Sequence, residues 1–132
     1  MTKKKIMVAI KYWETIANHD YDTMLALFKS KRYSDSLFFG HIVLEKILKG
    51  LVVKKTKEQA PYTHDLVRLA RLANIGSSKE EIISLNNVNE FNIRARYPEK
   101  KLEFYKKSTL KYTERNLNRI KDVYKNLCQK LK

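Results

Sequence analysis

The sequence is poor in the residues that shape β-rich and disulfide-stabilised folds. Its 132 residues include only three glycines, two prolines and one cysteine, Cys128. So few turn-forming residues argue against a many-stranded β fold, and so few glycines argue against a phosphate-cradling loop. A single cysteine excludes a scaffold built on disulfides and favours a reducing compartment.

Long hydrophobic runs are also missing. The apolar stretch Ile6 to Ile10 lies between lysines near the start of the chain and is too short for a signal peptide or a membrane span. We therefore expect a cytoplasmic protein with no membrane association. Apolar residues still make up 43% of the chain, which is enough for one core and excludes a disordered basic tail. Without a linker or an internal repeat, residues 1–132 are expected to form one domain.

Acidic residues are scarce beside basic ones. The chain carries 28 Lys and Arg against 14 Asp and Glu, a formal net charge of +14. Residues 91–132 hold 13 basic and 4 acidic side chains, so most of the excess lies in the last third. Such an excess attracts anionic partners such as nucleotides or nucleic acid, or it serves only to keep a small helical protein in solution.

Apolar residues recur at helical spacing along almost the whole chain, which predicts an all-α protein. We expect long helices over about 7–28, about 33–54 and from about 108 onward, with short helices over about 63–72 and about 78–91. Thr63 is the expected N-cap of the first short helix, and Ser77 or Ser78 that of the second. Residues 92–107 are expected to form a long connection around Pro98.

The last helix has the most regular apolar seam. Its steps of three and four are typical of a helix packed lengthwise against near-parallel neighbours. The seam comprises Leu110, Thr113, Leu117, Ile120, Tyr124, Leu127 and Leu131. The sequence therefore predicts an antiparallel up-and-down helical bundle with three long and two short helices.

No constellation of residues predicts a metal centre or a nucleophile. None of the three histidines is one helical turn from another, and Cys128 has no second cysteine to join it as a zinc ligand. The chain also lacks a G-x-S-x-G turn, a P-loop and a dinucleotide fingerprint. We expect neither a metal nor a cofactor.

Two acidic residues on apolar helix faces are the first candidates for chemistry. Glu45 lies one turn from both His41 and Lys49 on the second long helix. Because burial of an isolated carboxylate is costly, Glu45 either has a cationic or hydrogen-bonding partner or flanks the surface. Asp20 on the first helix either pairs with a basic residue across the bundle or borders a cleft.

The segment Arg94-Ala95-Arg96-Tyr97-Pro98 is the second candidate. Guanidinium groups suit phosphate through paired hydrogen bonds, and both arginine and tyrosine can stack on a base. The alternative is structural, with Arg94 and Arg96 neutralising carboxylates such as Glu45 or Asp20.

A third candidate lies opposite the seam of the last helix, where basic side chains step by four at Lys111, Arg115 and Arg119. A solvated surface is the favoured interpretation, although a face that follows phosphates would have the same pattern.

Several short motifs, in order along the chain from about residue 8 to 130, resemble those of HEPN-domain proteins. The opening helical pair is similar at Trp13, Ala17, Asp20, Tyr33 and the run Glu45-Lys46-Ile47-Leu48-Lys49. Thr63-His64-Asp65-Leu66 resembles the start of the family's third helix. Phe91-Asn92 with Ala95-Arg96-Tyr97-Pro98 resembles the R-Y-P element of the branch found beside minimal nucleotidyltransferases.

The resemblance implies a homodimeric helical bundle that binds nucleotides or RNA. It also implies a toxin–antitoxin-like pair, in which this chain is the toxin-like half and a nucleotidyltransferase is the antitoxin. The ligand-binding positions it indicates are Glu45, Lys49, His64, Arg94 or Arg96, and Tyr97. The family's ribonucleases carry an arginine followed four to six residues later by a histidine, and neither Arg94 nor Arg96 has one there. Lysine transfers protons poorly near neutral pH, so we expect binding rather than RNA cleavage.

Three functions therefore stay open. The first is a nucleotide- or RNA-binding module with a nucleotidyltransferase partner, the second an endoribonuclease that uses His64 or His41 as its proton carrier, and the third a helical interaction scaffold. We also expect a homodimer, because the aromatic surface exceeds what one small core need bury. That surface is attributed to Phe38, Phe39, Phe91, Phe104 and the eight tyrosines.

Overall fold

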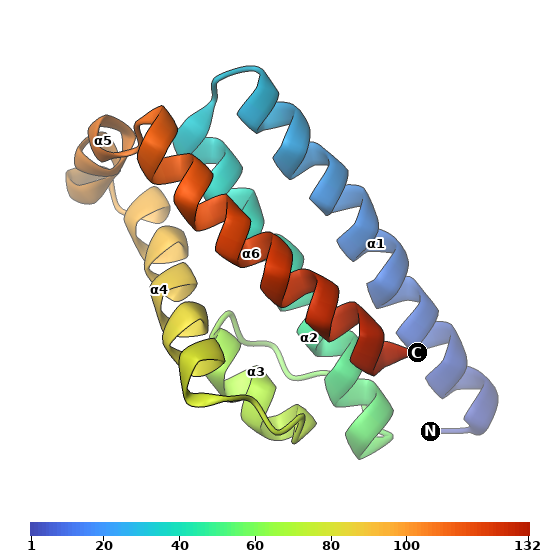
Figure 1. Cartoon of the computed structure of the whole chain (residues 1–132). Helices are drawn as coiled ribbons and strands as arrows, with labels where there is room; N and C mark the ends of the chain where they lie inside the picture. The colour runs from blue at the N-terminus through green and yellow to red at the C-terminus, as the bar shows by residue number, and fades with distance from the viewer.

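Six helices and no strands make up the computed structural model, which describes residues 1–132 (Figure 1). The helices are α1 (Lys3–Lys29), α2 (Tyr33–Thr56), α3 (Leu66–Ala73), α4 (Lys79–Arg96), α5 (Pro98–Lys107) and α6 (Leu110–Leu131). The predicted all-α bundle is confirmed. None of these helices combines the length and the apolar character that a membrane crossing requires.

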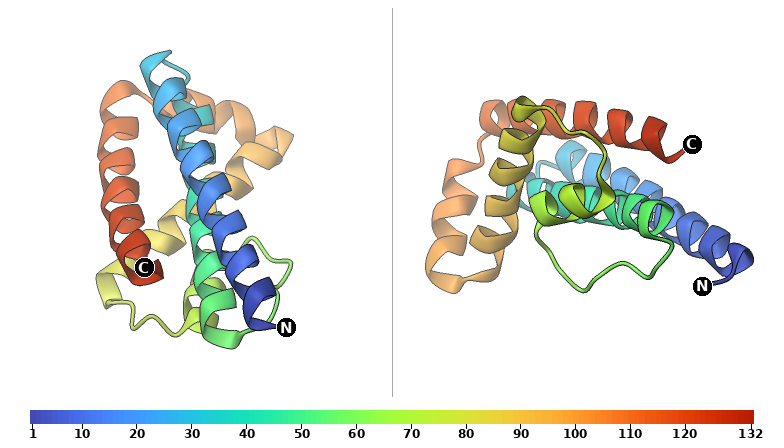
Figure 2. Two further views of the ribbon diagram at one scale, coloured as in Figure 1. Left: turned by 90° about the vertical axis from the view of Figure 1, so that its right-hand side faces the viewer. Right: turned by 90° about the horizontal axis from the view of Figure 1, so that it is seen from below.

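Helix α2 is the centre of the bundle, and every other helix packs against it. It runs between α1 and α6, with α3 and α4 on its remaining side (Figures 1 and 2). Fourteen of its residues are buried, and its leucines, isoleucine and valines contribute much of the core. A helix that is apolar on nearly all sides is a buried helix, so any polar residue on it needs a partner within the protein.

Helices α2 and α6 pack tightly against each other at Gly40. A Cβ atom at this position would lie 2.5 Å from Cδ1 of the fully buried Ile120, which is closer than two carbon atoms can pack. Because Gly40 has no side chain, Ile120 and the rest of the α6 seam can pack against α2 at the centre of the bundle. Most of the predicted seam is buried, from Thr113 to Leu131, but Leu110 is half exposed.

The start of α3 differs from the prediction. Its N-cap is Asp65 rather than Thr63, and Asp65 Oδ1 accepts hydrogen bonds from the backbone N–H groups of Val67 and Arg68 at 3.1 and 3.4 Å. A carboxylate suits the positive end of the helix dipole. The hydroxyl of Thr63 instead accepts from the backbone N–H of Asp65 at 3.2 Å and so braces the cap residue. The cap of α4 is Ser78, one of the two serines predicted.

The prediction of a long connection over residues 92–107 is wrong. Helix α4 continues to Arg96, and α5 begins at Pro98. Tyr97 alone is extended between them, with φ −95° and ψ 122°, as expected before a proline. Proline at the first position of a helix loses no hydrogen bond, so Pro98 starts a helix here rather than a loop. The bundle accordingly has one helix more than the five predicted.

Two of the four phenylalanines expected to add surplus surface are in the core instead. Phe91 and Phe104 are buried, and their rings stack with centroids 5.7 Å apart. This pair joins α4 to α5, and it fixes the short helix against the end of the longer one.

Candidate functional site

A buried carboxylate on α2 is the centre of a polar cluster. Glu45 is only 4% exposed, yet both of its oxygens have partners. Oε1 lies 2.8 Å from Nδ1 of His64, and Oε2 accepts a hydrogen bond from Nζ of Lys49 at 3.1 Å. Burial by itself would raise the pKa of Glu45, but the hydrogen bond with His64 and the charge of Lys49 outweigh it and lower the pKa. Glu45 is therefore a carboxylate at neutral pH.

His41, one turn before Glu45, holds the backbone of the α2–α3 connection. Its Nε2–H donates to the carbonyl oxygen of His64 at 2.8 Å, and Nδ2 of Asn92 donates to its Nδ1 at 3.4 Å. Burial lowers the pKa of His41, so the ring is neutral, with one nitrogen donating and the other accepting. Because the side chain is fully buried, its role is to position His64 rather than to touch a ligand.

Helix α4 extends the cluster toward the surface through an amide and a guanidinium group. Oδ1 of Asn92 accepts from Nη1 of Arg96 at 3.5 Å, one turn further along the helix. A continuous chain of polar contacts thus runs from Arg96 through Asn92 and His41 to His64 and Glu45. Arg94 takes no part, since its Nε lies 3.9 Å from Oε2 of Glu90. Neither arginine is paired with Glu45 or Asp20, and the carboxylate beside Arg94 is that of Glu90, one turn earlier on the same helix.

A pocket of about 560 Å³ opens beside this chain of contacts. Its lining is almost wholly polar and comes from α2, α3's N-cap, the connection before it and α4. It comprises His41, His64, Asp65, Asn86, Asn87, Asn89, Glu90, Asn92 and Ile93. The volume is in the range of small-molecule sites.

The asparagines of this pocket are the functional residues that the sequence reasoning missed. Four of them fall within seven residues of α4, a density of amides on one helix that was the available signal. Asn89 also anchors the pocket, because its Nδ2 donates to Asp65 Oδ1 at 3.0 Å and its Oδ1 accepts from the backbone N–H of Leu66 at 3.0 Å. Amides both donate and accept hydrogen bonds, as the edges of nucleobases do.

The remaining predicted residues lie apart from the pocket lining. Asp20 is on α1, where its carboxylate lies 3.3 Å from Nδ1 of the adjacent His19. It has no ion pair across the bundle and does not line this pocket. Tyr97 follows Arg96 at the junction of α4 and α5, and about half of it is exposed.

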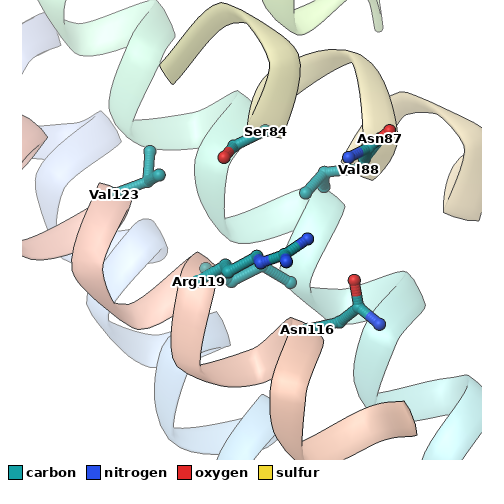
Figure 3. A pocket seen from close by; sticks show the side chains of 7 residues that line it. Ser84, Asn87, Val88, Asn116, Arg119 and Val123 are labelled. Atoms are coloured by element: carbon teal, nitrogen blue, oxygen red, sulfur yellow. The ribbon is translucent and has the colours of Figure 1, made fainter. Parts of the chain in front are cut away.

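The basic side chains of α6 form a surface rather than a site. Lys111, Arg115 and Arg119 are all exposed, as the favoured interpretation predicted. Figure 3 shows Arg119 and Asn116 of α6 facing Asn87 and Val88 of α4. The space that they enclose is about 10 Å³, room for about one water molecule and no larger ligand.

No group of three or more His, Cys, Asp or Glu side chains converges in a way that would hold a metal ion. The polar groups that line the pocket are two histidines, four asparagines and the carboxylates of Asp65 and Glu90, and the guanidinium group of Arg96 is hydrogen-bonded to the lining residue Asn92. Such a set can bind an anion and hydrogen-bond a heterocycle.

The family model described as HEPN domain matches residues 10–131. No curated protein and no solved structure matches the chain. The matched range contains every residue of the polar cluster.

We expect acid to destabilise the protein because of the buried His41. Above about pH 6.5 the imidazole is neutral in both the folded and the unfolded chain. Below that pH the unfolded chain takes up a proton that folded His41 resists, so the free energy of unfolding falls by up to about 1.4 kcal/mol per pH unit. The lowered pKa of Glu45 adds a further loss below about pH 4.3.

Urea unfolding at about pH 7.5 and about pH 5 measures this effect. The matched variant is His41→Gln, which keeps a polar side chain but cannot titrate. We expect the variant to be less stable at the higher pH and to lose less stability than the wild type on acidification. An equal loss in the two proteins would show that His41 is not the group responsible.

Proposed function

The chain belongs to the HEPN domain family, and we propose that it is a nucleotide- or RNA-binding module whose ligand occupies the pocket beside His64. The observation that carries this proposal is the composition of that pocket. Four asparagines and His64 line it, and Arg96 is hydrogen-bonded to its lining residue Asn92. Amides suit the edge of a base, and the guanidinium group of Arg96, which is hydrogen-bonded to the lining residue Asn92, suits a phosphate.

The two acidic residues of the pocket do not oppose an anionic ligand as free charges. Asp65 caps α3 and accepts from Asn89, and Glu90 lies 3.9 Å from Arg94. The net charge of +14 adds a long-range attraction for any phosphate-bearing ligand. The field brings the ligand to the protein, and the pocket supplies the specific contacts.

We extend the proposal to the partner. The segment Arg96-Tyr97-Pro98, which resembles an R-Y-P element, lies at the α4–α5 junction, where Pro98 keeps Tyr97 extended beside Arg96. This supports assignment to the branch found beside minimal nucleotidyltransferases, with the chain as the toxin-like member of a toxin–antitoxin-like pair. The nucleotidyltransferase would then be the protein partner.

The main test is the substitution Arg96→Ala. A lost charge-assisted hydrogen bond to phosphate is worth about 1.5–3 kcal/mol, so we expect the dissociation constant for ATP or a short single-stranded RNA to rise roughly 10- to 150-fold. Isothermal titration measures it. The matched control is Arg71→Ala, which removes the same charge from the exposed face of α3 and should leave affinity within about twofold. If folded Arg96→Ala binds as tightly as the wild type, the site is wrong.

A homodimer is proposed on the exposed apolar side chains around α5. Leu102, Tyr105 and Leu110 are each at least half exposed, and they lie in a short stretch next to Tyr97. Burial of such a patch against a second copy would remove apolar surface from water. We expect light scattering at micromolar concentration to give a dimeric mass, and Leu102→Glu to shift it to a monomer. A monomeric wild type would contradict the proposal.

One observation also favours a second candidate function, RNA cleavage with His64 as the proton carrier. If Nδ1–H of His64 donates to Glu45 at 2.8 Å, the neutral ring presents Nε2 as its basic nitrogen. The His64 side chain is 43% exposed and lines the pocket, whereas the side chain of His41, behind it in the pocket lining, has no exposed surface. A carboxylate that orients a histidine in this way is the arrangement of a general base.

Incubation of pure protein with RNA tests this candidate. If the site cleaves, His64→Ala should lower the rate by about 10²- to 10⁴-fold, since that is the usual contribution of a positioned acid or base. His19→Ala is the matched control, because His19 is exposed on α1 and does not line the pocket. If the RNA stays intact after incubation with the wild-type protein, cleavage by the chain alone is ruled out and the binding function remains.

A further inference from the structure

An aromatic cluster lies next to the pocket and has no part in the site described so far. Tyr62 is 94% exposed on the α2–α3 connection, and its ring centroid lies 5.9 Å from that of His64. The same ring lies 5.8 Å from Nζ of Lys49. That ammonium group also lies 5.5 Å from the ring of Trp13 on α1, against which Tyr12 packs edge-on at 5.1 Å. Two aromatic rings, those of Tyr62 and Trp13, thus lie next to one lysine, and a third packs on Trp13.

The exposed ring of Tyr62 is held by a well-anchored backbone. The carbonyl oxygen of His64 accepts from buried His41, the imidazole of His64 meets buried Glu45, and the backbone N–H of Thr63 donates to the carbonyl of Pro61. The connection crosses the side of α2 that faces away from α6, where no helix covers it (Figure 2). A ring on a fixed backbone loses little conformational entropy when a ligand stacks on it.

Cations interleave with these rings. Nζ of Lys46 lies 5.6 Å from the centroid of the Trp13 ring, and Nζ of Lys49 lies 5.5 Å from the same centroid. Aromatic rings alternating with basic side chains are the feature by which proteins hold unpaired bases and the phosphates between them. His64 joins the two regions, since it lines the pocket and also contacts Tyr62.

We propose that Tyr62 and Trp13 form a stacking platform for an unpaired base that adjoins the nucleotide held in the pocket. The ligand class is then single-stranded RNA of two or more nucleotides rather than a free mononucleotide. This inference rests on the proposed function, because it takes the pocket as the first nucleotide site. Duplex RNA is excluded as a ligand of the platform, because its bases are already stacked on one another.

The test compares AMP with a single-stranded RNA of about ten nucleotides, a length within the range that stacking proteins cover. We expect the RNA to bind more tightly than AMP and the same RNA in a duplex to bind more weakly than the single strand. Tyr62→Ala should weaken single-strand binding roughly 5- to 150-fold, the effect of one lost base–aromatic stack, and leave AMP affinity within about twofold. Tyr62→Phe should retain it, because the ring rather than the hydroxyl stacks.

Two further measurements make the result specific. Trp13 is the single tryptophan of the chain, so its fluorescence should be quenched by the oligonucleotide and less by AMP. Tyr105→Ala is the matched control, because that tyrosine is also exposed but lies on α5. The nearly complete exposure of Tyr62 means that its substitution should leave the fold intact, which circular dichroism and thermal unfolding verify.

Each other outcome overturns the inference. Unchanged oligonucleotide affinity in Tyr62→Ala would show that the exposed ring does not stack on the RNA, and equal weakening of AMP and RNA would place the ring in the pocket itself. AMP binding without tighter RNA binding removes the platform and leaves the proposed function standing. If the wild type binds neither ligand, both proposals fail.

Discussion

A buried negative charge on the central helix is the interaction on which the rest of the arrangement depends. An unpaired carboxylate at the position of Glu45 would cost several kcal/mol, so the chain must bring positive or hydrogen-bonding groups to it. Lys49 comes from the next turn of α2, but His64 must come from the far end of the α2–α3 connection. The contact between Glu45 and His64 therefore determines the path of the α2–α3 connection along α2 and the place where α3 begins.

The pocket is a consequence of this constraint. With His64 held by Glu45 and His41, Asp65 caps α3 at a place where Asn89 of α4 can reach it. The asparagine-bearing face of α4 is thereby turned toward the imidazole. Apolar packing supplies the bundle, whereas a short chain of polar contacts sets the position of the groups that would meet a ligand. Such contacts are directional, so they define atomic positions more closely than hydrophobic burial does.

The pattern of residues along the sequence was sufficient to predict the features that depend on residues close together in the chain. Helical spacing predicted the bundle, and the penalty for burying a carboxylate predicted that Glu45 would have a partner. The same reasoning could not pair Glu45 with His64, 19 residues away, because that contact depends on the path of the connection. The prediction at Pro98 failed because proline can start a helix as well as end one, and the cap is Asp65 rather than the predicted Thr63 because both residue types are good caps and the two lie only two residues apart. The pocket was missed because the density of asparagines on α4 does not by itself show which other residues they face, and that depends on the fold.

The contact between Gly40 and Ile120 has a consequence for how this sequence can change. The two positions, 80 residues apart, share one volume between α2 and α6, and only the backbone of one leaves room for the side chain of the other. A methyl group gained at position 40 must be matched by one lost at position 120, as an alanine and valine pair would do. Neither step is neutral alone, so the route between such sequences passes through an overpacked or a cavity-bearing intermediate. The spacing between α2 and α6 therefore depends on the residues at positions 40 and 120 together, and not on either one alone.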